Sequence, residues 1–181
     1  VQTCALPILN ISGMLRVLEA ARKTDVQKII FSSSAAVYGD NPALPLTENL
    51  IPAPSSFYGL TKWMTEKYLA LYHKIYELSY TVLRYSNVYG PRQGADGEGG
   101  VIYIFAKSLA ENKPITIFGD GRQTRDFISV HDVVSANLSA LHQADGEIIN
   151  ISTKTELSLN DLAAEMIAAA GCSADLLSYG P

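Results

Sequence analysis

The stretch Gln27-Lys-Ile-Ile-Phe-Ser-Ser-Ser34 decides the fold class of this chain. Its apolar centre, with two adjacent isoleucines, is typical of a short buried strand in a parallel sheet. Three serines follow at the end of the strand, which is the edge where open α/β sheets present residues to ligands. The sequence therefore predicts a strand over 27–32 and a ligand-facing edge at Ser32, Ser33 and Ser34.

A strand–helix–strand unit is predicted by the segments that follow. Ser55 or Ser56 can cap a helix that we expect over about 56–78, and Tyr80-Thr-Val-Leu-Arg-Tyr85 predicts a strand over 80–86. Strand, helix and strand in this order indicate a right-handed βαβ crossover. Further expected elements are helices at 10–24, 101–111, 130–143 and 158–170, and strands at 115–118, 125–129 and 147–151.

Tyr58 and Lys62 lie four residues apart in the expected helix, so they share one of its faces. An ammonium beside a phenol favours the phenolate and lowers a pKa that is otherwise about 10. Such a base suits hydride chemistry at an alcohol carbon near neutral pH. With Ser34 they form a candidate catalytic set. The alternative is a pair of surface neighbours, since the chain contains 10 Tyr.

Composition and charge exclude several classes of function. The 181 residues are 48% hydrophobic with a net charge of −4, which is typical of a globular protein and unfavourable for a nucleic-acid surface. No apolar run reaches the roughly 20 residues of a membrane span, and no secretory signal is visible. The Cys and His residues have no metal-ligand spacing. We expect a cytoplasmic protein without a metal, membrane or nucleic-acid partner.

Four motifs in order resemble the extended short-chain dehydrogenase/reductases. Within that group the likeness is to the NAD-dependent epimerase/dehydratase family, nearest to the UDP-glucose 4-epimerases. It runs in register from about Asn10 to the end and is carried by Phe31–Gly39, Tyr58–Lys62, Leu83–Arg92 and Phe118–Phe127. The resemblance implies an α/β fold: part of a Rossmann-like doubly wound parallel sheet, with part of a small substrate-binding lobe.

The resemblance also implies an activity. It is that of an isomerase of galactose metabolism, which interconverts UDP-glucose and UDP-galactose through a 4-keto intermediate with bound NAD. The full-length protein would be a homodimer with a UDP-sugar as its substrate. Ala35 and Ala36 stand where related dehydratases or decarboxylases place acidic residues, which favours epimerisation. Three alternatives stay open: an NAD(P)-dependent reductase or dehydrogenase, a UDP-N-acetylglucosamine or uronate 4-epimerase, and a non-catalytic binding domain.

Residue roles are implied in the same way. Catalysis falls to Ser34, Tyr58 and Lys62; cofactor binding to Ser32, Ser33, Tyr58, Lys62 and Tyr85; and substrate binding to Ser34, Asn87, Val101, Thr116, Phe118, Gln123 and Arg125. Arg125 suits a diphosphate because a guanidinium can bind two phosphate oxygens at once. For Arg125 the alternative is a surface ion pair with Asp126.

The sequence lacks the Gly-x-x-Gly-x-x-Gly turn on which this family seats the cofactor pyrophosphate. We therefore expect a fragment, inactive by itself. Residues 9–93 would be the C-terminal part of the NAD-binding domain, and 94–181 mainly a truncated nucleotide-sugar lobe with Rossmann elements at 130–151. Gly94–Gly100 would be a flexible connection. Residues 1–8 back-translate to a common sequencing-library adapter, and we interpret them as a non-native leader.

Overall fold

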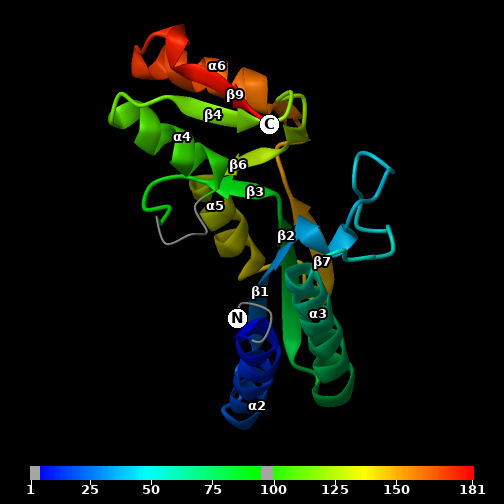
Figure 1. Ribbon diagram of the computed structural model, residues 1–181. Coiled ribbons are helices and arrows are strands. Elements are labelled where there is room, and N and C mark those ends of the chain that lie inside the picture. Colours follow the sequence, from blue (N-terminus) through cyan, green and yellow to red (C-terminus); the bar gives the residue numbers. More distant parts are fainter. Residues whose placement is uncertain (1–4, 95–99) are drawn as a thin grey trace. The chain divides into compact units, whose positions relative to one another are not determined.

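The computed structural model describes residues 5–94 and 100–181, which belong to two compact units (Figure 1). The first unit contains the described residues up to Ser86, together with Val133–Ile151. The second contains the described residues of Asn87–Asp132, together with Ser152–Pro181. Most of the connection expected at Gly94–Gly100 lies outside the described residues.

A parallel sheet forms the centre of the first unit. It contains β1 (Lys28–Ser34), β2 (Ser79–Tyr85) and β7 (Glu147–Ile151), in the order β1-β2-β7. The middle strand β2 is buried along most of its length, with Val82 and Leu83 at its centre. The α/β fold with a parallel sheet that the sequence predicts is confirmed.

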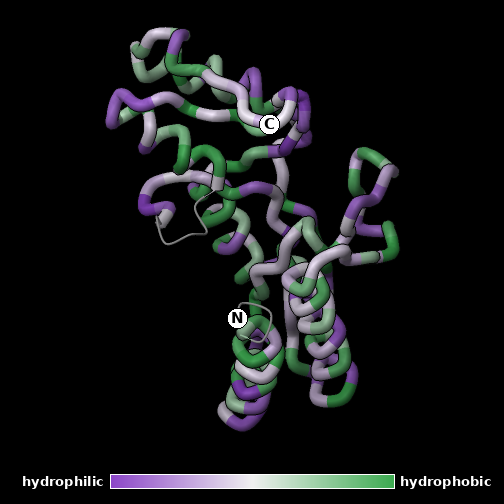
Figure 2. Tube along the Cα trace, in the orientation of Figure 1, coloured by the Kyte–Doolittle hydropathy of each residue, from purple (hydrophilic) through white to green (hydrophobic). Residues whose placement is uncertain are grey.

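Two helices pack on this sheet, and the buried face of α3 (Phe57–Tyr76) is of mixed polarity. α3 contacts β1 and β2, and α2 (Met14–Lys23) contacts α3 (Figure 1). Leu18, Leu69 and Val82 are fully buried in the core that these elements share. Hydrophobic and hydrophilic residues alternate around both helices (Figure 2). On α3 the apolar residues Leu60, Leu71 and Ile75 remain exposed.

The second unit consists of short strand pairs and two helices. The parallel pairs are β3 (Asn87–Tyr89) with β6 (Phe127–Ser129) and β4 (Ile115–Phe118) with β9 (Leu177–Gly180). The antiparallel pair is β5 (Thr124–Arg125) with β8 (Leu157–Ser158). α4 (Val101–Ala110) and α6 (Leu159–Ala170) pack on β4 around Phe105, Ile117 and Leu162. The remaining elements are η1 (Pro7–Gly13), η2 (Ala35–Tyr38), α5 (Val130–Ala140) and η3 (Ala174–Leu176).

Two element boundaries expected from the sequence are wrong. The helix expected from residue 10 already includes Ala5, the first described residue, and the π-helical η1, where Pro7 is tolerated near the helix N-terminus. The single strand expected over 125–129 is divided into β5 and β6, because its two halves pair with different partners. Among the described residues, no helix is both long and apolar enough to cross a membrane.

Candidate active site

The segment that follows β1 is held against the first turn of α3 by a close backbone approach. A Cβ atom on Gly59 would clash with the carbonyl oxygen of Ala36, so the backbones of η2 and α3 can approach only because residue 59 is glycine. Ser56 caps α3 by accepting the N–H of Gly59 at 3.0 Å. This packing brings the residues after Ser34 against the helical turn that carries Tyr58.

Tyr58 and Lys62 lie on one face of α3, as their spacing predicts. The Nζ atom of Lys62 is 5.7 Å from the centroid of the Tyr58 ring and 5.1 Å from that of Phe31. It also donates to the carbonyl oxygen of Ser32 at 2.8 Å, which ties the ammonium to the end of β1. Burial lowers the pKa of Lys62. The Tyr58 side chain remains 41% exposed and therefore open to a ligand.

Ser34 ends β1 and caps the short helix η2. Its Oγ atom accepts the N–H of Ala36 at 3.2 Å. This bond uses the oxygen as an acceptor and does not use the hydroxyl hydrogen. Ser34 can therefore still donate a hydrogen bond to a substrate oxygen.

Ser32 and Tyr85 bring further polar groups to the same edge of the sheet. Their hydroxyl oxygens are 3.1 Å apart, and they stand at the carboxyl ends of the neighbouring parallel strands β1 and β2. Ligands of α/β proteins bind at this edge. Two hydroxyls and the Lys62 ammonium offer the hydrogen bonds that the ribose hydroxyls of a dinucleotide require. The residues present here therefore fit a nicotinamide cofactor.

Ser33 has a different environment from its two neighbours. Its side chain is buried and donates to Glu66 Oε1 at 2.6 Å. Glu66 also accepts from Arg84 Nε at 3.0 Å and from Arg84 Nη2 at 2.6 Å. The side chains of Arg84 and Glu66 are only 3% and 2% exposed. Burial opposes the charge of Arg84, but the hydrogen bonds to Glu66 and Tyr38 outweigh it, so the pKa of Arg84 is raised.

The buried pair extends into a network that the sequence did not reveal. Arg84 Nη1 donates to the Tyr38 hydroxyl at 2.8 Å, and Tyr38 donates to Asn150 Oδ1 at 2.8 Å. Asn150 in turn donates from its side chain to the Leu46 carbonyl at 3.1 Å. One signal was present, because Glu66 continues the four-residue spacing of Tyr58 and Lys62 along α3.

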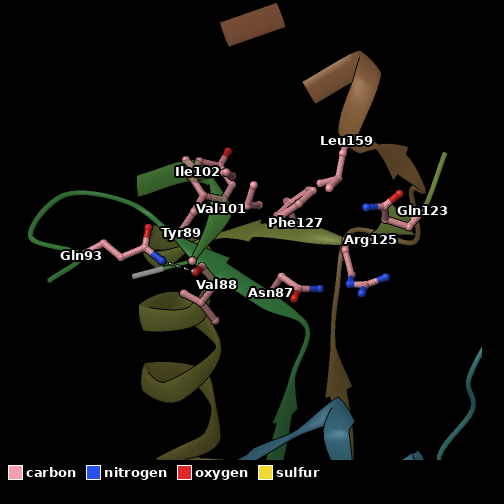
Figure 3. Close-up of a pocket in the computed structure, with 11 residues that line it drawn as sticks. Asn87, Val88, Tyr89, Gln93, Val101, Ile102, Gln123, Arg125, Phe127 and Leu159 are labelled. Carbon is pink, nitrogen blue, oxygen red and sulfur yellow. Dashed lines mark hydrogen bonds between the residues drawn. The ribbon is translucent and has the colours of Figure 1, made fainter. Parts of the chain in front are cut away.

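The second unit contains a pocket of about 440 Å³. Four of the predicted substrate residues line it: Asn87, Val101, Gln123 and Arg125. Figure 3 shows the polar ends of Asn87 and Arg125 near one another, with the apolar side chains of Val101, Phe127 and Leu159 beside them. A pocket with both polar and apolar lining side chains suits a ligand that joins an anionic group to a flat, less polar ring.

The polar residues of this pocket are fixed by backbone hydrogen bonds. The backbone N–H and side-chain Nδ2 of Asn87 both donate to the Asp126 carbonyl at 3.0 Å. Arg125 Nη1 donates to the Thr124 carbonyl at 2.7 Å, and Gln123 Nε2 donates to the Phe118 carbonyl at 3.3 Å. The two carboxylate oxygens of Asp126 accept the N–H of Thr153 at 3.0 and 3.1 Å.

Two predicted substrate residues lie elsewhere in the second unit. Thr116 and Phe118 are on the exposed face of β4, and the described lining of the pocket does not include them. Thr116 Oγ1 is 3.0 Å from Ser178 Oγ, and the Phe118 side chain is 69% exposed. The sequence analysis assigned no role to several residues that line the pocket: Val88, Tyr89, Gln93, Ile102, Phe127 and Leu159.

The family, sequence and structure comparisons with known proteins agree with one another. The NAD dependent epimerase/dehydratase family matches residues 8–152. A Methanocaldococcus jannaschii protein assigned as a UDP-glucose 4-epimerase is 50% identical over 155 residues, which are 85% of this chain and 50% of that protein. The Thermotoga maritima UDP-glucose 4-epimerase, solved with UDP-glucose, has a TM-score of 0.91 at 43% identity, over 95% of this chain and 56% of that one.

A second solved structure is that of an enzyme named for a different sugar. The UDP-N-acetylglucosamine 4-epimerase of Methanobrevibacter ruminantium, in complex with UDP-N-acetylmuramic acid, has a TM-score of 0.90 at 35% identity, over 94% of this chain and 55% of that one. The chain thus spans about half the length of the relatives it matches. Because the family match covers most of the sequence and the fold agrees closely, the chain belongs to the NAD dependent epimerase/dehydratase family.

Proposed function

We propose that the protein containing this chain is a nucleotide-sugar 4-epimerase that interconverts UDP-glucose and UDP-galactose. The observation that carries this proposal is the Tyr58–Lys62 pair, with the ammonium 5.7 Å from the phenol ring. A neighbouring cation favours the phenolate, which is the base that oxidation of a sugar hydroxyl requires. The bond from Lys62 to the Ser32 carbonyl at 2.8 Å supports this role, because it holds the cation in place.

Each catalytic residue then has a defined task. Tyr58 removes the proton of the sugar 4-hydroxyl and returns a proton when that hydroxyl forms again. Ser34 donates its hydroxyl hydrogen to the same sugar oxygen, and Lys62 favours the phenolate and binds the cofactor ribose. When bound, NAD would accept a hydride from sugar C4 and return it to the opposite face of the 4-ketose, so that the configuration at C4 inverts.

The second unit would bind the nucleotide diphosphate. We assign the diphosphate to Asn87 and Arg125, because an amide and a guanidinium can donate to several phosphate oxygens. Val101 and Gln123, with Thr116 and Phe118 on β4, are assigned to the nucleotide. A homodimeric, cytoplasmic enzyme of galactose metabolism remains a prediction.

The decisive experiment uses the full-length protein with UDP-galactose. We expect conversion to UDP-glucose without net accumulation of NADH. Tyr58→Phe should lower kcat by about 100-fold or more, as expected for loss of a general base. Lys62→Met should also lower kcat, and the pH optimum of the reaction should shift upward. NADH formed in proportion to an oxidised sugar would instead identify a dehydrogenase, and no interconversion of any UDP-sugar would contradict the proposal.

UDP-N-acetylglucosamine is the second candidate substrate. It is supported by the TM-score of 0.90 with an enzyme acting on that sugar, which is almost as high as the 0.91 found with a UDP-glucose enzyme. The ratio of kcat/KM for UDP-galactose and UDP-N-acetylgalactosamine separates the two. We expect the ratio to favour UDP-galactose.

A further inference from the structure

Asn137 lies on α5 and directs its side-chain amide toward Tyr85. Its Nδ2 atom donates to the Tyr85 hydroxyl at 2.8 Å and to the Val133 carbonyl, one turn earlier in the helix, at 2.8 Å. A carbonyl oxygen can only accept, so the nitrogen of the amide and not its oxygen must face Val133. Both amide hydrogens of Asn137 are therefore in use, and the direction of its bond to Tyr85 is fixed.

The direction of the Asn137–Tyr85 hydrogen bond bears on the next hydrogen bond, between Tyr85 and Ser32 at the end of β1. Tyr85 accepts from Asn137, which leaves its own hydroxyl hydrogen for Ser32 Oγ at 3.1 Å, the other partner of this hydroxyl among the described residues, and we infer this direction for the bond. Ser32 then accepts from Tyr85, and its own hydroxyl hydrogen remains available at the exposed end of the strand. The carbonyl oxygen of Ser32 accepts from Lys62 at 2.8 Å. Ser32 is thus held both at its side chain and at its peptide oxygen.

We propose that Asn137 is a positioning residue of the cofactor site. It orients the Tyr85 hydroxyl, which fixes Ser32 and thereby the carbonyl against which Lys62 rests. The same chain of bonds makes the Ser32 hydroxyl a hydrogen-bond donor toward an acceptor oxygen of the bound dinucleotide. This inference rests on the proposed function only in naming the dinucleotide as the ligand.

A double-mutant cycle in the full-length protein tests whether Asn137 acts through Tyr85. Loss of one hydrogen bond is expected to weaken binding by about five-fold, so Asn137→Ala should raise the Kd for NAD by about that factor. In a Tyr85→Phe background the same substitution should have no further effect, because the phenol oxygen is already gone. Leu138→Ala, at a neighbouring side chain that is 59% exposed, should leave the Kd unchanged. Equal effects of Asn137→Ala in both backgrounds would overturn the proposal.

A second readout needs no cofactor. The pKa of Lys62 can be followed by NMR in protein with isotope-labelled lysine, with Lys62→Arg to assign the signal. Burial holds this pKa low, and the ring of Tyr58 is the titratable side chain beside the ammonium. Asn137→Ala should raise the pKa of Lys62, because a loosened Ser32 lets water reach the ammonium. An unchanged pKa would overturn the proposal, whereas failure to bind NAD with the pKa shift intact would refute only the proposed function.

Discussion

Glu66 and Arg84 form a buried ion pair in the first unit. Removing one partner of a buried pair leaves the other charge uncompensated, at a cost of about 3–5 kcal/mol. We therefore expect Glu66→Gln, which preserves the shape of the side chain, to lower the free energy of unfolding by about 3 kcal/mol or more. Urea unfolding of the full-length protein, followed by circular dichroism, measures the change.

The matched control for this substitution is Glu111→Gln. Glu111 pairs with Lys113 at 2.7 Å, but both side chains are exposed, at 43% and 68%. Exposed pairs contribute little because water screens them, so the urea midpoint should hardly move. Similar midpoints for the two variants would show that the buried pair has no special role.

Tyr72 makes the stability of the protein depend on pH in the alkaline range. Its hydroxyl donates to Glu19 Oε1 at 2.7 Å, and this bond, with some burial, raises the pKa of Tyr72 to about 12. An unfolded tyrosine loses its proton near pH 10, so the folded state retains this proton to a higher pH. The stabilisation is therefore complete below about pH 10 and is lost as the pH rises through about 12.

Tyrosinate absorbance measures this titration. The difference between the curves of the unmodified protein and of Tyr72→Phe should show one group that titrates with a pKa of about 12, above the ordinary value for tyrosine. The same substitution should also flatten the loss of stability over that pH range. A difference curve centred near the ordinary pKa of tyrosine would contradict the assignment.

At the scale of single residues, the sequence predicted only contacts between residues that are close together in the chain. Tyr58 and Lys62 are neighbours on one helix, so their spacing was sufficient to bring them together. Ser33 and Glu66 are 33 residues apart, and Tyr85 and Asn137 are 52 apart. Those contacts depend on how the elements pack, and no periodicity within one element encodes them.

At the scale of elements, two glycines in helical segments have opposite roles. A methyl group on Gly59 would clash with the carbonyl oxygen of Ala36, whereas a methyl group on Gly13 would lie 3.7 Å from the Ile8 carbonyl, an ordinary contact. Alanine is favoured over glycine in a helix by about 1 kcal/mol. We therefore expect Gly13→Ala to stabilise the protein and Gly59→Ala to destabilise it by about 1–3 kcal/mol through overpacking.

Thermal unfolding of the two variants measures this contrast. Gly59→Ala should also lower kcat, because η2 and the first turn of α3 move apart and separate the residues they carry. The paired design removes the effect of helix propensity, which is the same in both variants. Equal shifts in Tm would mean that the close approach to Ala36 is easily relaxed.

The elements that the sequence predicted best were those with local signals. Ser55 or Ser56 was expected to cap α3, and Ser56 does so, while apolar runs marked β4 and β7 at their observed bounds. β3, β8 and β9 were missed, since these short strands lack an apolar run like that of β4. Such short strands form because a distant partner completes their hydrogen bonds, and that partner is not visible in the strand itself.

At the scale of the whole molecule, the described sheet has β1 and β7 as its edge strands. The loop before α3 contacts β7, where the backbone N–H of Asn150 donates to Glu48 at 2.8 Å. β1 carries the apolar residues Ile29, Ile30 and Phe31, all half-buried. An apolar edge strand is a template for pairing with another chain.

We therefore expect residues 1–181, expressed alone, to self-associate in a concentration-dependent manner and to show no epimerase activity. Sedimentation velocity over a range of concentrations measures the association, and calorimetry with NAD measures binding. The full-length protein, tested in parallel, should bind NAD and not form large aggregates. A monomeric 181-residue chain with measurable affinity for NAD would contradict this expectation.

The polypeptide leaves one unit for the other after Ser86, after Asp132 and after Ile151. A chimera that joins the front of one homologue to the back of another at a single point therefore always divides at least one of the two units between the parents. Grafting a new substrate preference onto this scaffold requires transplanting two separate stretches together. Gene shuffling among relatives should accordingly yield functional hybrids mainly when crossovers occur in pairs.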